Sequence, residues 1–135
     1  NKFYKKFFLI DESYNANPLS VRSAIENFSN LQKKGKRKYF LFGDMLELGR
    51  NSYIYHKKIS KFINNSDIDK TFVYGDKATE TYKLLRKSKR GAIVKNFKSF
   101  DNRISQILKN GDFLMIKGSN AMKLHEISKR FLRSN

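Results

Sequence analysis

The chain has 135 residues, 39% of them hydrophobic and 14% aromatic, and a formal net charge of +17. This length suits one folded domain, and the hydrophobic content excludes a chain that is disordered by composition. The absence of cysteine excludes disulfides and thiolate metal sites. Because the two histidines, His56 and His125, lie in separate segments, no metal site is predicted.

The apolar runs of the chain are short. None approaches the roughly 20 residues of a membrane span, and residues 1–10 are too short for a signal peptide, so we expect a cytoplasmic protein without a membrane partner. The charge of +17 raises the alternative of a basic nucleic-acid or nucleotide-binding module. Because lysine and arginine are spread along nearly every segment, a solvated basic surface is favoured over a nucleic-acid face.

Short apolar runs alternate with segments of helical spacing. The runs at residues 7–10, 39–42, 71–74, 92–94 and 113–116 predict strands that are buried on both faces. Apolar residues recur between and after them with the spacing of amphipathic helices. These residues are Val21, Ile25, Phe28 and Leu31; Tyr55, Ile59, Phe62 and Ile63; Tyr82 and Leu85; Ile104, Ile107 and Leu108; and Met122, Leu124, Ile127 and Phe131.

This alternation with short loops predicts a parallel sheet covered by helices on both faces. The expected fold class is α/β, a Rossmann-like, doubly wound and mostly parallel sheet of about five or six strands in a single domain over residues 1–135. Ligands of such sheets bind outside the carboxyl ends of the strands. The loops that leave strands are therefore the candidates for a functional site.

The loop after the first strand, "DESYNANP", is rich in polar groups. Asn17 is suited to cap a helix and Pro18 to start one. Asp11, Tyr14 and Asn15 add a carboxylate, an aromatic hydroxyl and an amide at a helix N-terminus, where a nucleotide could be held. An elaborate turn with Tyr14 packed locally explains the same residues equally well.

Two later loops combine glycine with charged or hydroxyl side chains. Residues 43–49 place Asp44 and Glu47 between two glycines; this pair could hold a substrate ammonium, but the spacing favours simple bonds to loop amides. Residues 117–120, "KGSN", can be interpreted equally well as an anion site or as an ordinary turn. A lone helical histidine such as His56 is more often a surface or packing residue than a catalytic base. No P-loop, GxGxxG or GxSxG motif occurs.

Three motifs together resemble the C-terminal domain of the Mur ligases. They are "IDESYNANP", "FGDMLELG" with His56 following its last glycine, and "MIKGSNAM", and they occur in the family's order across almost the whole chain. The resemblance is to the branch of the family that adds a D-Ala-D-Ala dipeptide. In this family, an N-terminal domain binds the UDP-sugar and a central domain carries the P-loop. The resemblance thus implies that residues 1–135 are the third domain alone.

The resemblance implies an ATP- and Mg²⁺-dependent amide ligase of cytoplasmic peptidoglycan synthesis. The partners would be UDP-N-acetylmuramoyl-tripeptide, D-Ala-D-Ala, ATP and the other two domains, with Mg²⁺ held mainly by the central domain and no catalytic residue in this domain alone. The resemblance also implies two sets of binding residues. Asp11, Tyr14, Asn15 and Asn17 would face the nucleotide; Asp44, Met45, Glu47, Lys117, Gly118 and Ser119 would line the dipeptide pocket, with His56 and Asn120 as further candidates.

Overall fold

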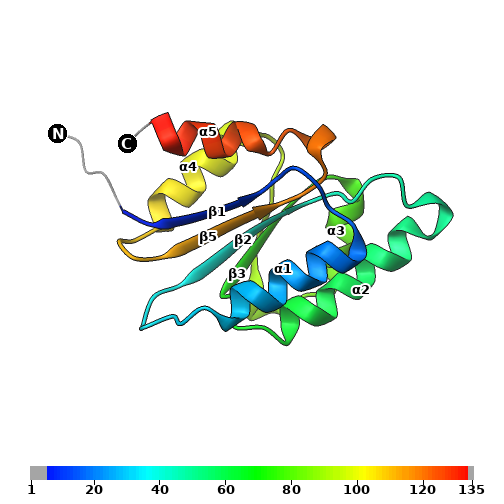
Figure 1. Cartoon of the computed structure of the whole chain (residues 1–135), viewed down its shortest axis with the longest axis horizontal. Coiled ribbons are helices and arrows are strands. Elements are labelled where there is room, and N and C mark those ends of the chain that lie inside the picture. Colours follow the sequence, from blue (N-terminus) through cyan, green and yellow to red (C-terminus); the bar gives the residue numbers. More distant parts are fainter. Residues whose placement is uncertain (1–5, 134–135) are drawn as a thin grey trace.

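The computed structural model describes residues 6–133, which form one five-stranded parallel sheet with helices on both faces (Figure 1). The strands are β1 (Phe8–Glu12), β2 (Lys38–Gly43), β3 (Lys70–Tyr74), β4 (Arg90–Ile93) and β5 (Phe113–Lys117). The helices are α1 (Pro18–Asn30), α2 (Ser52–Asn64), α3 (Asp76–Lys83), α4 (Phe97–Ile107) and α5 (His125–Arg133), with short 3₁₀ turns at Gly49–Asn51, Lys87–Lys89 and Asn120–Met122. The predicted fold class is confirmed.

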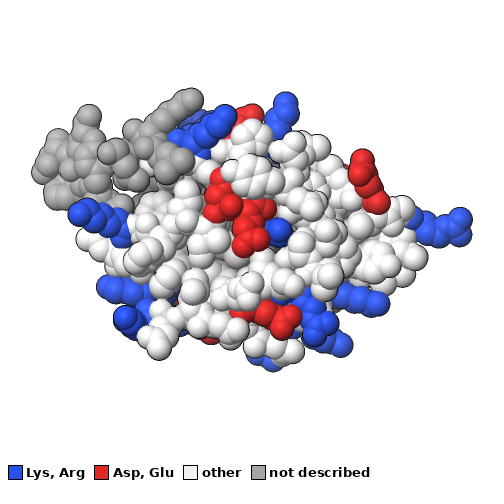
Figure 2. All heavy atoms as spheres, viewed as in Figure 1, with Lys and Arg blue, Asp and Glu red and all other residues white. Residues whose placement is uncertain are grey.

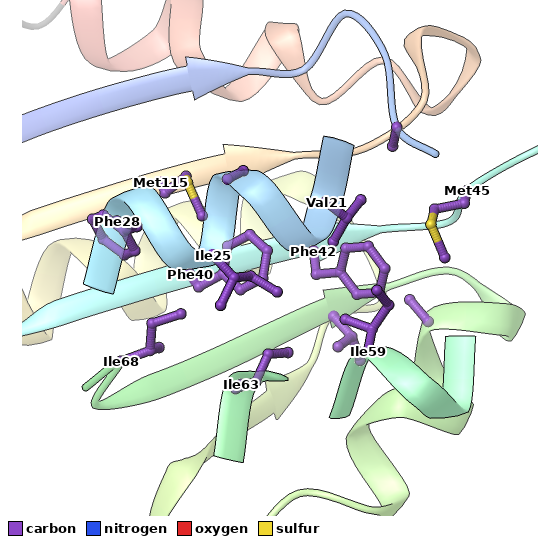
Figure 3. Packing of buried hydrophobic residues seen from close by; sticks show 14 of the residues in the cluster. Val21, Ile25, Phe28, Phe40, Phe42, Met45, Ile59, Ile63, Ile68 and Met115 are labelled. Carbon is purple, nitrogen blue, oxygen red and sulfur yellow. The ribbon is translucent and has the colours of Figure 1, made fainter. Parts of the chain in front are cut away.

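The strand order is β1-β5-β2-β3-β4, and all pairs are parallel. The helices α1, α2 and α3 cover one face, whereas α4 and α5 cover the other (Figure 1). The core therefore has two layers. On the first face, Val21, Ile25 and Phe28 of α1 pack with Phe40 and other strand residues (Figure 3).

The second layer lies under α4 and α5. There Phe100 and Ile104 pack with Leu41, Phe72 and Ile116 of the central strands. Alternate residues of β2 thus serve opposite layers, and every residue of this strand is buried. This is why a continuous apolar run, rather than an alternating one, correctly indicated a central parallel strand.

Two predicted details are wrong. The strands β1 and β4 were expected to be buried on both faces, but both lie at edges of the sheet; Phe8 is 59% exposed and Ile93 is 44% exposed. The last helix was expected to include Met122 and Leu124, but Met122 ends a 3₁₀ turn, Lys123 follows at a φ of +59°, and α5 begins only at His125. Local apolar content does not reveal which strands will be outermost, because that depends on the order of pairing.

Candidate functional site at the carboxyl edge of the sheet

The carboxyl ends of all five strands lie at one edge of the sheet, and the chain leaves them toward different faces. Strand β5 leads to α5 on one face, while its neighbours β1 and β2 lead to α1 and α2 on the other. A second divergence occurs between β3 and β4, because α3 and α4 lie on opposite faces. Such divergence opens a crevice between neighbouring loops, and ligands of doubly wound sheets bind there.

The loop after β1 presents two of its polar side chains to solvent. Tyr14 is 70% exposed and Asn15 is also exposed. Asp11 is partly buried, and its Oδ1 accepts hydrogen bonds from the main-chain nitrogen (3.0 Å) and the hydroxyl of Ser13. The loop is thus a braced turn that carries an exposed aromatic hydroxyl and an exposed amide.

Asn17 is the N-cap of α1, as predicted, and Pro18 begins the helix. The Asn17 Oδ1 accepts from the Ser20 main-chain nitrogen at 2.9 Å, and the Ser20 hydroxyl accepts from the Asn17 nitrogen at 3.0 Å. This reciprocal capping satisfies two helix donors that would otherwise be unpaired. The Asn17 side-chain oxygen is therefore engaged within the fold.

The loops after β2 and β5 are bonded to each other. The Leu46 main-chain nitrogen donates to the Ser119 hydroxyl at 2.9 Å, and the Ser119 nitrogen donates to the Asp44 carbonyl at 3.2 Å. The two strands also approach closely, since a Cβ on Gly118 would lie 3.2 Å from the Cα of Gly43. Gly118 and Ser119 therefore act as parts of the framework.

Lys117, the last residue of β5, is buried. Its Nζ forms an ion pair at 3.4 Å with the carboxylate of Glu12, its register partner on β1. The lysine links the first and third of the predicted loops. Its charge is balanced by this carboxylate, which is 40% exposed.

Asp44 is nearly buried and holds the start of α3. Its Oδ1 accepts from the Ala78 main-chain nitrogen at 2.7 Å, in the first turn of that helix. Gly75 must be glycine for this contact, because its φ is +116° and a Cβ there would lie 2.3 Å from the same oxygen. The carboxylate therefore bonds to a main-chain amide, as the spacing favoured, but to one of α3 rather than one of its own loop.

The remaining residues predicted to bind the dipeptide lie in different environments from one another. The Met45 side chain is fully buried in the layer with Val21 and Phe42 (Figure 3). Glu47 is exposed at a φ of +62°, and Asn120 is exposed in the turn after β5. Asp44 and Glu47 are the two carboxylates of this set, and Asp44 but not Glu47 lines the pocket between β3 and β4.

His56 is fully buried beneath the loop after β2. Its Nε2 lies 2.9 Å from the Met45 main-chain nitrogen, and its Nδ1 lies 2.7 Å from the Ser52 carbonyl. Burial lowers the pKa of this imidazole below its ordinary value, against smaller raising effects of the Ser52 carbonyl and Asp44. His56 thus has the surroundings of a packing residue, which is the alternative that the sequence favoured over a catalytic base.

A pocket of about 670 Å³ opens at the second divergence, between the ends of β3 and β4 and the turn at residues 120–123. Two carboxylates, Asp44 and Asp76, and two ammonium groups, Lys95 and Lys123, line it. The other lining residues are Tyr74, Gly75, Thr79, Ile93, Val94, Phe97, Ala121 and Met122. The pocket thus combines both signs of charge with apolar walls, which suits a small zwitterion.

Sequence reasoning missed Asp76, Lys95 and Lys123. Asp76 and Lys95 lie within two residues of the ends of β3 and β4, in "YGDKA" and "IVKNF". They therefore belong to loops that leave strands, the same criterion that selected the other three loops. These loops were passed over because they have one glycine or none and show no dense polar cluster. Lys123 could be found only once the break between Asn120–Met122 and α5 was known.

On the face that Figure 2 shows, the basic residues do not gather into one patch. Figure 2 shows lysine and arginine around the periphery of the visible face, with acidic side chains grouped nearer its centre. Several cations are used inside the fold, including Lys38 beside Asp67 and Lys89, which donates to the carbonyls of Ser66 and Ile68. The visible face thus offers no continuous basic patch to a nucleic acid.

Among residues 6–133, no group of three or more histidine, aspartate or glutamate side chains is placed to hold a metal ion. Over the same residues, no helix is long and apolar enough to cross a membrane.

Comparison with known proteins places the chain in one family. The family model described as "Mur ligase, glutamate ligase domain" matches residues 3–120. A UDP-N-acetylmuramoyl-tripeptide--D-alanyl-D-alanine ligase of Bacillus subtilis is 32% identical over 93% of this chain and 28% of its own length. An enzyme of the same name from Buchnera aphidicola subsp. Acyrthosiphon pisum is 31% identical over 94% of this chain and 27% of its own length.

Solved structures agree with the fold. The crystal structure of the MurF ligase from Thermotoga maritima in complex with ADP superposes with a TM-score of 0.81 and 21% identity, covering 98% of this chain and 30% of that one. A MurF structure from Acinetobacter baumannii gives a TM-score of 0.79 at 22% identity, over 98% of this chain and 30% of that one. The chain thus spans less than a third of the length of these relatives. Because the family model covers residues 3–120, the chain belongs to the Mur ligase family, as the C-terminal domain of that family.

Proposed function

We propose that this chain is the closing domain of an ATP-dependent ligase that joins D-Ala-D-Ala to UDP-N-acetylmuramoyl-tripeptide in cytoplasmic peptidoglycan synthesis. The observation that carries the proposal is that relatives bearing this name match the chain over more than nine-tenths of its length. Because the chain spans about 28% of the Bacillus relative, the UDP-sugar and ATPase functions would lie in other domains of the same polypeptide.

The nucleotide would meet the loop after β1. The exposed Tyr14 and Asn15 offer an aromatic hydroxyl and an amide beside the N-terminus of α1, and Asp11 and Asn17 brace the turn that presents them. The solved Thermotoga relative contains ADP, which supports a nucleotide in this enzyme class. Mg²⁺ would be held mainly by the central domain of the ligase, as the family resemblance implies.

The dipeptide would enter the pocket between β3 and β4. Asp76, with the second oxygen of Asp44, would hold its ammonium, while Lys95 and Lys123 would hold its carboxylate. Its two methyl groups would contact the apolar wall that includes Ile93 and Phe97. Met45, Lys117, Gly118 and Ser119 would contribute as the frame that fixes Asp44, and Glu47 and Asn120 would approach only from the rim.

In the proposed reaction, ATP phosphorylates the peptide carboxylate, and the dipeptide amine displaces phosphate to form the amide. A free amine is the nucleophile, so the dipeptide ammonium must lose a proton before attack. The carboxylate pair at the pocket would orient that nitrogen, and closure of the domain would exclude water from the acyl phosphate. Orienting two reactants in this way can supply several kcal/mol of the rate enhancement.

The test is phosphate release by the complete natural polypeptide that contains this chain. With ATP, Mg²⁺ and UDP-N-acetylmuramoyl-tripeptide, we expect release that depends on D-Ala-D-Ala, and no turnover by the 135-residue chain alone. L-Ala-L-Ala is the matched control for the stereochemistry of the dipeptide. Release without the dipeptide, or by the isolated chain, would contradict the proposal.

A further inference from the structure

The segment of residues 44–46 is held by neighbours on every side. The Asp44 nitrogen donates to the Tyr74 carbonyl at 3.3 Å, and the Asp44 carbonyl accepts from Ser119. The Leu46 nitrogen donates to the Ser119 hydroxyl. Between them, the Met45 nitrogen donates to the Nε2 of His56 at 2.9 Å. This imidazole is the only titratable group that bonds to the main chain of the segment within residues 6–133.

The two partners of the imidazole fix its tautomer. A main-chain carbonyl can only accept a hydrogen bond, so the proton lies on Nδ1 and faces the Ser52 carbonyl at 2.7 Å. A main-chain N–H can only donate, so Nε2 faces Met45 with a bare lone pair. Both nitrogens are thus satisfied only when the ring is neutral.

The surroundings of His56 leave little alternative to this arrangement. The ring is fully buried and lies 5.9 Å from the ring of Phe42. The His56 carbonyl accepts the Thr81 hydroxyl at 2.6 Å, which ties α2 to α3 at the same level. The charged groups that act on the ring are Asp44, which favours protonation, and Lys77 on α3, which opposes it. The His56 ring thus connects the loop after β2 with α2, and the His56 main-chain carbonyl connects α2 with α3.

We propose that neutral His56 is a positioning residue of the ligase: by accepting the Met45 N–H it sets the place of Asp44 at the dipeptide pocket. Asp44 precedes Met45 directly, lines the pocket and binds the first turn of α3 through Oδ1. If the Met45 N–H lost its acceptor, a buried donor would be left unpaired and the segment would shift to find water or another partner. His56 itself does not line the pocket, so it acts through Asp44.

This inference rests on the proposed function, and its test uses two substitutions in the complete ligase. Glutamine at position 56 can return a side-chain oxygen to the Met45 N–H, whereas phenylalanine fills the space without an acceptor. For His56→Phe we expect the KM for D-Ala-D-Ala to rise about tenfold, as follows when a buried donor is orphaned, with the KM for ATP unchanged. His56→Gln should stay within about threefold of wild type.

Ile63→Ala provides the structural control. Ile63 lies on the same helix and is fully buried, but it packs in the core away from the loop, so its truncation should destabilise the fold without changing the dipeptide KM. The proposal would be overturned if Ile63→Ala raised the dipeptide KM as much as His56→Phe does. It would also be overturned if His56→Gln raised that KM as much as His56→Phe does.

A second measurement needs neither variant to fold. In ¹⁵N-histidine-labelled wild-type chain, we expect the nitrogen shifts of His56 to report a proton on Nδ1 and a bare Nε2 at neutral pH. A proton on Nε2, or a ring that exchanges freely between tautomers, would overturn the inference. Because this spectrum requires no turnover, it also separates failure of the inference from failure of the proposed function, which would show as absent dipeptide-dependent phosphate release.

Discussion

The amino edge of the sheet pairs charged residues inside the fold, whereas the pocket at the carboxyl edge presents charged residues to solvent. At the amino edge, Lys38 is fully buried and its Nζ bonds to the Asp67 carboxylate at 2.9 Å and to the carbonyls of Ser29 and Leu31. Lys33 pairs with Asp69 beside it at 3.0 Å. At the carboxyl edge, Asp76, Lys95 and Lys123 line an open pocket, and within residues 6–133 none of them forms an ion pair.

This difference shows that residue type alone does not indicate whether a lysine serves stability or binding. A buried ammonium must be paired within the fold, because burial of an unpaired charge is costly. An ammonium at a solvated pocket keeps its hydration until a ligand replaces it. Substitutions at the amino edge should therefore change stability without changing KM, and substitutions at the pocket should do the reverse.

The largest expected effect is at the amino edge. Lys38→Met would leave the Asp67 carboxylate and two carbonyls without their buried partner, so we expect the free energy of unfolding to fall by about 3 kcal/mol. Urea denaturation of the 135-residue chain measures this loss. Lys33→Met is the control, because its partly exposed ion pair should contribute about 0.5 kcal/mol. Equal losses in the two variants would contradict the comparison.

A smaller effect, on both the free energy of unfolding and the dipeptide KM, is expected from Gly75→Ala. The positive φ and the contact of the new Cβ with the Asp44 carboxylate should together lower the free energy of unfolding by about 2 kcal/mol. Because Asp44 must move, the KM for D-Ala-D-Ala should rise as well.

Gly35→Ala is the matched control for Gly75→Ala. Gly35 also has a positive φ of +79°, but no atom lies within 4 Å of the place of a Cβ. We expect a loss of about 1 kcal/mol from backbone strain, measured by the same denaturation, and no change in KM. If Gly35→Ala altered the dipeptide KM, the effect of Gly75→Ala could not be assigned to Asp44.

The difference between the edges also explains what could be predicted from sequence. Strands such as β2 and the cap at Asn17 follow from local patterns, so they were found. The bond from Leu46 to Ser119 joins residues 73 positions apart, and the burial of Lys117 depends on the pairing of β1 with β5. Lys38 was likewise counted with the solvated basic residues, because nothing local reveals that its ammonium is enclosed by Ser29, Leu31 and Asp67.

The third effect tests the pocket itself. Asp76 is exposed at the start of α3, so Asp76→Asn should change the free energy of unfolding by no more than about 0.5 kcal/mol. In the complete ligase, loss of the carboxylate should raise the KM for D-Ala-D-Ala about tenfold, the expected weight of one charge-assisted hydrogen bond. Initial rates at varied dipeptide and fixed saturating ATP measure this change.

Glu26→Gln is the control for Asp76→Asn, since Glu26 is an exposed carboxylate on α1 that is paired with Arg22 and does not line this pocket. It removes the same charge from the domain. A rise in dipeptide KM of similar size in both variants would indicate a general electrostatic effect rather than a contact at Asp76.

The smallest effect concerns pH. The pKa of folded His56 lies below its ordinary value of 6.5 because the ring is buried. Between the folded and unfolded pKa values of His56, this residue binds more protons in the unfolded chain than in the folded one. The contribution of His56 to the free energy of unfolding therefore rises with pH in that range and is constant above about 6.5. On acidification below that point, His56 should remove up to about 1.4 kcal/mol per pH unit.

The contribution of His56 is isolated by subtracting the pH profile of His56→Gln from that of the wild-type chain, since glutamine does not titrate and the carboxylates are common to both. The difference should be flat above pH of about 6.5 and fall below it. A flat difference throughout would mean that the folded ring titrates as it does in the unfolded chain. That result would be incompatible with an imidazole whose two nitrogens are bonded to Ser52 and Met45. It would mean that a charged side chain is accepted at the carboxyl edge even where it is buried, as it is at the solvated pocket.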